Sequence, residues 1–396
     1  METTAAFTGL RCVDCGERFD VEDATHRCPD CGGVLDSAYE YGSIALDGER
    51  LAERPFGSMW RYEELLPFPR EAAVTIDEGT TPLVDCPAMA SEMGVGRVLI
   101  KDEGRSPTGS FEDRGMAVAT TAAREHGAED VALASTGDAG QAVAAYAGRA
   151  GIDAHAFLPA RSNHTNKAMV NVHGGDMTVV GGRITDAIAA YDDAIEEEGW
   201  YPLGAFATPY RHEGAKTAAY EIVERLGWEV PDAIVAPTGG GVGLVGVWKG
   251  VSELRELGLI DELPAIYAAQ SAGCAPIVEA FEEGLERHES WEHPDTICGG
   301  IEIPDPEASP LVLEALRESG GGAVATDDEE ILESAIAVAK GEGVEMGTSA
   351  AAAASGAWRL AEGGEFGEDD TVVLLNTASA NKDADVLRSH LMGKGI

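Results

Sequence analysis

The sequence is poor in positive charge. Its 396 residues include 28 lysines and arginines against 70 aspartates and glutamates, which gives a formal net charge of −42. So acidic a surface repels the phosphates of nucleic acids and of anionic membranes, and we expect neither as a partner. Self-repulsion destabilises a compact chain at low ionic strength, whereas at about 1 M salt the Debye length falls to about 3 Å. The composition therefore predicts a protein of a halophile.

Long apolar runs are missing as well. No segment approaches the roughly 20 apolar residues of a membrane-spanning helix, so no membrane association is expected. The first residues, METTAAFTGLRC, show no basic stretch followed by an apolar one, which a signal peptide would have. The sequence therefore predicts a cytoplasmic protein.

Cysteine is scarce, but four of the seven cysteines are regularly spaced, as CxxC, twelve residues and CxxC. Two disulfides or a redox pair are the alternatives to a metal site. A reducing cytosol argues against disulfides, and no βαβ pattern surrounds either pair. The spacing predicts a closed structural zinc site of four thiolates within a ribbon at residues 1–36. The predicted ligands are Cys12, Cys15, Cys28 and Cys31.

Most of the remaining chain alternates between apolar strands and helices, which predicts βαβ units and parallel sheets. The predicted strands are 97–100, 130–134, 154–158, 177–180, 233–236, 265–269, 322–325 and 371–376. The predicted helices include 115–126, 140–150, 163–173, 183–198, 216–226 and 244–258.

Two loops between a strand and a helix have the composition of ligand-binding turns. Residues 98–115 read VLIKDEGRSPTGSFEDRG, where Ser110 is the expected N-cap of the helix, with Asp113 as its capping-box partner. Residues 237–243 read PTGGGVG, a turn whose backbone N–H groups can face an anion at the start of a helix. Without further information either loop could be an ordinary turn.

The segment Pro107–Gly115 resembles the active-site segment of threonine synthases, which are pyridoxal-phosphate (PLP) enzymes. That family reads proline, threonine, glycine, serine, phenylalanine, lysine, aspartate, arginine, glycine, and its lysine holds PLP as an imine. Eight of these nine positions match, but Glu112 stands in place of the lysine. Further matches, including EGTTPL at residues 78–83, extend the resemblance to nearly the whole chain.

The resemblance implies a two-domain α/β fold of PLP fold type II, similar to the tryptophan-synthase β chain, with three-layer parallel sheets behind the zinc ribbon. It implies a large cofactor domain at 37–96 and 208–396, a small substrate domain at 97–207, a cofactor cleft between them, and a homodimer. The implied activity is that of a lyase converting O-phosphohomoserine to threonine. The implied cofactor contacts are Asp138, where the family has asparagine, together with Thr238, Gly239, Gly240, Gly241, Val242, Gly243 and Thr377. The implied contacts to an amino-acid or phosphorylated substrate are Thr80, Thr81, Ser110, Ser135 and Thr136.

Glu112 leaves three hypotheses open. A carboxylate cannot form an imine with PLP, but a glutamate can act as a general base. The chain is then a diverged enzyme of the threonine-synthase type with Glu112 as its catalytic residue. Alternatively, it is a non-catalytic or PLP-independent paralogue that binds a phosphorylated or amino-acid ligand. The third hypothesis is a cation-assisted lyase in which Glu112, Asp113 and Asp138 are the ligands.

Overall fold

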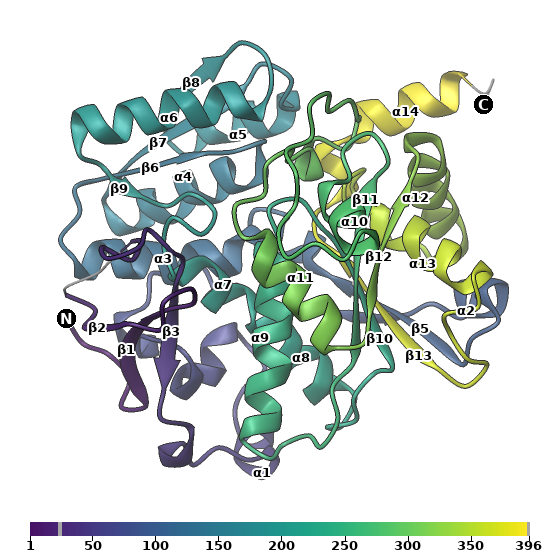
Figure 1. Cartoon of the computed structure of the whole chain (residues 1–396), viewed down its shortest axis with the longest axis horizontal. Coiled ribbons are helices and arrows are strands. Elements are labelled where there is room, and N and C mark those ends of the chain that lie inside the picture. The colour runs from purple at the N-terminus through teal and green to yellow at the C-terminus, as the bar shows by residue number, and fades with distance from the viewer. Residues whose placement is uncertain (23–25, 394–396) are drawn as a thin grey trace. The chain divides into compact units, whose positions relative to one another are not determined.

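The computed structural model describes residues 1–22 and 26–393 and forms two compact units (Figure 1). Residues 23–25 of the predicted ribbon and 394–396 of the predicted large domain lie outside the described residues. Unit 1 consists of Met1–Thr80, Glu112–Tyr220 and Lys249–Asp261. Unit 2 consists of Thr81–Phe111, Glu221–Trp248 and Glu262–Ile396.

Unit 2 is built on a six-stranded sheet with the strand order β12-β11-β10-β13-β5-β4. All neighbouring pairs are parallel except β4 with β5. The central strands are almost entirely buried, which explains their continuous apolar runs, because helices cover such a sheet on both faces. The strands are β4 (Leu83–Asp85), β5 (Arg97–Asp102), β10 (Ala233–Pro237), β11 (Ala265–Ser271), β12 (Gly322–Thr326) and β13 (Thr371–Asn376).

Helices α12 and α13 lie on one side of this sheet, and α10 and α11 lie on the other (Figure 1). The core on the α13 side is rich in alanine, which lets that helix approach the strands closely. The α-helices of unit 2 are α2 (Pro87–Met93), α10 (Pro276–Glu282), α11 (Ser309–Glu318), α12 (Asp328–Glu342), α13 (Ala352–Glu362) and α14 (Ala384–Gly393). Its 3-10 turns are η4 (Glu103–Arg105), η5 (Gly299–Ile301) and η6 (Ala380–Lys382).

Unit 1 contains two sheets. The first, β2-β1-β3, is antiparallel and carries the four regularly spaced cysteines at its end. The second, β8-β7-β6-β9, is parallel throughout. The strands are β1 (Phe7–Cys12), β2 (Arg18–Phe19), β3 (Leu35–Tyr39), β6 (Asp130–Ala134), β7 (Asp153–Pro159), β8 (Asp176–Val180) and β9 (Tyr201–Pro202).

Helices α3 and α4 supply much of the apolar core of unit 1, and two further helices pass from one unit into the other. The helices of unit 1 are α1 (Gly48–Ala52), α3 (Glu112–Glu125), α4 (Asp138–Ala150), α5 (His164–Val172), α6 (Ile184–Glu198) and α7 (Tyr210–Ala215). The two shared helices are α8 (Thr217–Arg225) and α9 (Val242–Glu256). The 3-10 turns are η1 (Tyr41–Ser43), η2 (Met59–Leu65) and η3 (Arg70–Ala72).

The predicted α/β class with parallel sheets is confirmed, and every predicted strand is present with its ends shifted by at most two residues. The sheet membership of one strand differs from the expectation. The predicted small domain began at residue 97, but β5 pairs with β13 and so belongs to the six-stranded sheet. The roles given to the two domains stay predictions. Among the described residues, no helix has the length and apolarity to span a membrane.

Candidate active site and cysteine cluster

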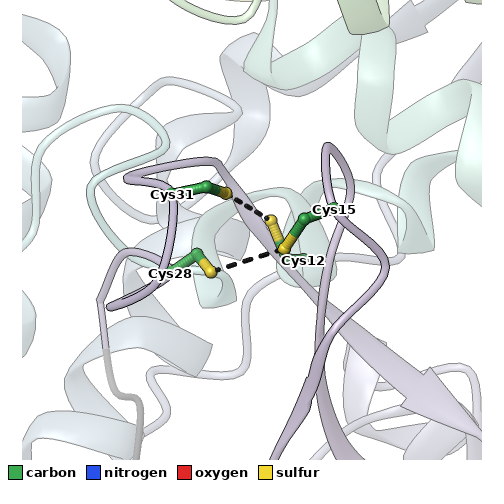
Figure 2. A group of neighbouring side chains, drawn as sticks. All are labelled: Cys12, Cys15, Cys28 and Cys31. Atoms are coloured by element: carbon green, nitrogen blue, oxygen red, sulfur yellow. Dashed lines mark hydrogen bonds between the residues drawn. The ribbon is translucent and has the colours of Figure 1, made fainter.

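The four cysteines of the predicted ribbon converge at one point (Figure 2). Their sulfur atoms all lie within 4.8 Å of one another, and the Sγ–Sγ distances are 3.5 Å for Cys12–Cys31 and 3.8 Å for Cys15–Cys28. Four thiolates at about 2.3 Å from a tetrahedral zinc ion would be separated by about 3.8 Å. Each pair turns on a glycine in the left-handed region, Gly16 at φ +76° and Gly32 at φ +75°. All four cysteines are free thiols, and the arrangement fits one zinc ion.

The thiols of this cluster differ in acidity. Burial opposes ionisation of Cys12, but backbone N–H groups of Cys15 and Asp14 outweigh it and lower the pKa of that thiol to about 7. The N–H of Gly33 favours the thiolate of Cys31, yet the neighbouring sulfur of Cys12 raises the pKa of Cys31 to about 12. The thiol with the lowered pKa thus suppresses ionisation of its neighbour, and a bound cation would relieve this conflict.

The glycine turn of unit 2 is tightly packed where β10 leads into α9. A Cβ on Gly239 would lie 3.0 Å from the Cα of Ile301, and one on Gly241 would lie 2.4 Å from Val312 Cγ2. Gly241 also has φ +91°, which glycine adopts without strain. The turn therefore requires glycine at these positions, and it leads directly into the N-terminus of a fifteen-residue helix, where N–H groups are free to bind an anion.

A second segment of unit 2 lies against this turn. The ring of Phe111 is 3.3 Å from where a Cβ on Gly243 would be. Its backbone N–H donates to the Thr377 carbonyl at 2.9 Å, and Ser110 forms a β-bridge with Ala378. The structure thus brings together three segments that the sequence analysis selected, those at 110–111, 239–243 and 377–378.

The prediction that Ser110 caps the following helix is wrong. Helix α3 begins at Glu112, and the buried hydroxyl of Ser110 has no hydrogen-bond partner among residues 1–22 and 26–393. The reason is the isolated β-bridge to Ala378, which engages the backbone of Ser110 two residues before the helix begins. A buried hydroxyl without a partner is costly, and a ligand that supplied an acceptor would remove that cost.

Glu112 forms an ion pair within unit 1. Its Oε2 accepts from Arg211 Nη2 at 2.5 Å, and the side chains are 14% and 4% exposed, respectively. Helices α3 and α7 cross closely because both have glycine at the contact. A Cβ on Gly214 would lie 1.9 Å from the Arg114 carbonyl oxygen, and one on Gly115 would lie 2.8 Å from that of Arg211. The carboxylate at position 112 thus has a specific cationic partner.

The loop that follows β6 carries three further predicted site residues. The hydroxyl of Ser135 accepts from the N–H groups of Gly137 and Gly140, at 2.9 and 3.0 Å. Thr136 is half-buried. Asp138, at the start of α4, accepts from Asn166 Nδ2 at 2.9 Å, so the amide in this pair belongs to Asn166. Asn166 was not predicted as a site residue, because its position in the sequence gives no sign that α5 brings it to this loop.

The two threonines of the EGTTPL segment have different surroundings. Thr80 lies in the left-handed region at φ +51°, which is unfavourable for a β-branched residue. The hydroxyl of Thr81 donates to Glu103 at 2.6 Å. Upstream, the buried carboxylate of Glu78 accepts from Trp60 and from Tyr146, at 2.6 and 2.9 Å, and so shapes the strained turn. Strain of this kind is typical of functional sites.

Two lysines that could supply the amine missing at position 112, Lys101 and Lys216, are both committed to carboxylates. Lys101 donates to Glu221 at 2.5 Å, and Lys216 donates to Glu213 at 2.6 Å and to Glu253 at 2.9 Å. Both lysine side chains are fully buried. Neither therefore presents an uncommitted amine that would substitute for the missing lysine at position 112.

The hypothesis of a cation-assisted lyase gains no support from the geometry. Within residues 1–22 and 26–393, two groups of metal-binding side chains converge. One is the cysteine cluster, and the other consists of Asp36, His212 and Glu213. The proposed ligands Glu112 and Asp138 are instead bound to Arg211 and Asn166.

Comparison with known proteins defines the class. Residues 74–378 match the family described as "Pyridoxal-phosphate dependent enzyme". The maize serine racemase structure, at 19% identity, superposes with a TM-score of 0.67 over 80% of this chain and 94% of its own, which shows the shared fold. The chain therefore belongs to the PLP-dependent enzyme family and has its fold type II architecture.

Within that family the chain is threonine-synthase-like. The threonine synthase of Methanosarcina acetivorans is 39% identical over 94% of this chain and 92% of its own length. That of Methanocaldococcus jannaschii is 37% identical over 95% of this chain and 93% of its own. The resemblance inferred from the sequence is thus confirmed, and it places the chain among the PLP-dependent lyases.

The residues predicted to contact PLP fit this cofactor only in part. The glycine turn before α9 suits a phosphate group, and Thr377 lies beside the segment that packs on that turn. Position 112 does not fit, because its carboxylate cannot form an imine and is paired with Arg211. The individual roles of the predicted site residues stay predictions.

Proposed function

We propose that this chain is a threonine-synthase-like enzyme whose reaction does not proceed through an imine at position 112. The observation that carries the proposal is the ion pair between Glu112 and Arg211. A buried carboxylate with a guanidinium partner is a built feature, since an unpaired charge there would be strongly destabilising. Position 112 is thus occupied by an ion pair instead of the lysine amine that the resemblance implies.

The proposed ligand is an amino acid or a related acid that carries a phosphate. The three glycines that follow Thr238, together with Val242 and Gly243, would bind the phosphate through backbone N–H groups at the start of α9. The N–H of Thr238 instead donates to the Ala269 carbonyl at 2.8 Å, which fixes the start of the turn on the sheet. Ser110 would donate its buried hydroxyl to the ligand, and Thr377 would lie beside it. Thr80, Thr81, Ser135 and Thr136 would bind the amino-acid portion.

Glu112 is the proposed catalytic residue of unit 1. Arg211 orients its side chain, and a glutamate at this position would act as a general base on a substrate carbon or hydroxyl. Position 112 has no primary amine that could form an imine with PLP. The family conversion of O-phosphohomoserine to threonine would therefore be altered. A ligand-binding paralogue without catalysis is the alternative outcome of the test.

The proposal is tested by adding PLP to the purified protein and to its Glu112→Lys and Glu112→Gln variants. We expect no visible imine band with the native chain or with Glu112→Gln, and a stable band with Glu112→Lys. If the single substitution Glu112→Lys were enough for threonine formation from O-phosphohomoserine, the other site residues would still support the family's reaction. An imine band in the native chain would contradict the proposal.

Three further properties belong to the proposed function. The cysteine cluster would hold one structural zinc ion, since its sulfur distances fit tetrahedral coordination. The charge of −42 would make the protein one of a halophile's cytoplasm, so the melting temperature should rise steeply toward molar salt. The family suggests a homodimer, which sedimentation of the purified protein would test.

A further inference from the structure

A buried network of charged and aromatic side chains begins five residues after the last cysteine of the cluster. Asp36 of β3 accepts from His212 Nε2 at 2.8 Å and from Lys249 Nζ at 2.5 Å. Tyr39, on the same strand, donates its hydroxyl to Glu213 at 2.6 Å. The strand next to the cysteine cluster therefore contacts two consecutive residues of α7.

The network extends to α9, and its interior is closed to water. Lys216 joins Glu213 to Glu253, and Lys249 pairs with Glu213 as well. Glu213 and Lys216 are fully buried, whereas Asp36 at the edge is one-third exposed. Asp36, His212 and Glu213 converge closely enough to hold a metal ion, but Lys249 already pairs with both carboxylates of this group.

The charges of this network are held in place by one another. Burial disfavours the Asp36 carboxylate, but Lys249 and His212 outweigh it and hold the pKa of Asp36 below its ordinary value. Burial likewise disfavours the Glu213 carboxylate, whereas Lys216 and Lys249 lower its pKa. Removing one member takes away part of the charge compensation or hydrogen bonding of the buried groups that remain, which is costly, so the network favours a single arrangement of α7.

Helix α7 also carries Arg211, the residue directly before His212. The Nη2 of Arg211 binds Glu112, while its Nε–H has no partner among the described residues. Because α7 and α3 touch through Gly214 and Gly115, a small shift of α7 would move the guanidinium away from Glu112. The contacts within α7 itself do not fix its register on α3, because the helix has only six residues.

We propose that Asp36 and Tyr39 are positioning residues that fix α7 through His212 and Glu213 and thereby hold Arg211 on Glu112. The cysteine ribbon then has a second role besides its own stability, because its last strand sets the ion pair at position 112. The inference rests on the proposed function only in taking Glu112 to act on the ligand.

A double-mutant cycle in the full-length chain without ligand tests this coupling. Glu112→Gln should lower the denaturation midpoint of the native chain, and in the Asp36→Asn background its effect should fall to about half or less, because distant sites without coupling are additive. Tyr39→Phe should act in the same direction and serves if Asp36→Asn does not fold. The matched control is Tyr41→Phe, which removes a hydrogen bond to Glu253 in the same network without touching α7.

A second measurement reads Arg211 directly. The guanidinium protons of Arg211, assigned by their loss in Arg211→Lys, should exchange with solvent about tenfold faster in Asp36→Asn and Tyr39→Phe, because the ion pair opens more often. They should exchange at the native rate in Tyr41→Phe. Additive midpoints together with unchanged exchange rates would overturn the inference. Since no ligand is used, a failure of the proposed function would leave both results unaffected.

Discussion

The glycine turn of unit 2 and the helix pair α3–α7 of unit 1 differ in how they relate to the family. The turn has the glycines that the resemblance predicts, and its packing against Ile301 and Val312 excludes side chains larger than hydrogen. The helix pair has a close glycine crossing and carries Glu112, where the resemblance predicts a lysine, in an ion pair with Arg211. The comparison teaches that a glycine turn suited to a phosphate can accompany an altered residue elsewhere in the chain when that residue has its own ionic partner, as Glu112 has in Arg211.

Removing metal from the cysteine cluster should have the largest effect, and it should affect unit 1 far more than the glycine turn of unit 2. A chelator, or Cys15→Ser, should destabilise unit 1 by several kcal/mol, because metal binding supplies folding free energy to such clusters. Phosphate affinity at the glycine turn should change much less. Metal content, thermal unfolding and phosphate titration measure these effects. Cys86→Ser is the control, since Cys86 is buried outside the cluster, and equal losses in both variants would contradict the assignment.

The same cluster should show a defined pH dependence. The pKa values of Cys15 and Cys31 are raised, so both thiols are protonated at neutral pH and lose protons when a metal binds. Metal affinity should therefore rise by about tenfold per pH unit for each proton released. Below about pH 7 Cys12 is protonated as well, so the dependence should become steeper as pH falls. Competition with a chromophoric chelator from pH 6 to 9 measures the slope, and a flat profile would contradict the cluster's role.

Removing the partner of Glu112 should have the next largest effect. Arg211→Leu leaves a mostly buried carboxylate without its guanidinium, and we expect a loss of about 3 kcal/mol in the free energy of unfolding. Combining it with Glu112→Gln should recover part of that loss. Urea denaturation of the two single variants and the double variant measures both. If the double variant were no more stable than Arg211→Leu, the ion pair would not be what holds α7 on α3.

A substitution in the glycine turn should lower stability less than Arg211→Leu, but it should also remove phosphate binding. Gly241→Ala places a methyl 2.4 Å from Val312 at φ +91°, and it should cost about 1 to 3 kcal/mol. It should also abolish binding of inorganic phosphate. Gly258→Ala is matched to it, with φ +69° but open space around the added methyl. That control should lose stability and keep phosphate binding, so loss of binding in both would refute a specific role for the turn.

Asp138→Asn should have the smallest effect on stability, within about 1 kcal/mol, because an amide oxygen can still accept from Asn166. The variant introduces the asparagine that the resemblance implies at this position. In the Glu112→Lys background it should tighten PLP binding, which a titration of the visible band would show. Weaker binding would place Asp138 outside the cofactor site.

The elements of the fold were predictable because their signals are local. The buried strands of the six-stranded sheet have uninterrupted apolar runs, and the spacing of the four cysteines predicted their convergence. The Glu112–Arg211 pair was not predictable, because it depends on two helices meeting at Gly115 and Gly214, about a hundred residues apart in the chain. The only available signal was the polar segment PYRHEGAKT at residues 209–217, which carries charges that the structure buries.

The start of α3 shows why residue preference alone misled the prediction at Ser110. Serine followed by an acid three residues later favours a helix cap, but the bridge to Ala378 decides the backbone conformation instead. At Ser110, the contact with Ala378, far away in the sequence, thus outweighed the local preference of serine for a helix cap.

The absence of an imine at or near position 112 is tested most directly by adding PLP to the native protein, reducing it with borohydride, and determining its mass and the modified peptide. The proposed function predicts no stoichiometric attachment of the cofactor to any lysine, while Glu112→Lys treated in parallel is labelled at residue 112. Stoichiometric labelling of any lysine in the native chain, whether Lys101, Lys216 or another, would contradict it, because another amine would then perform the family's chemistry.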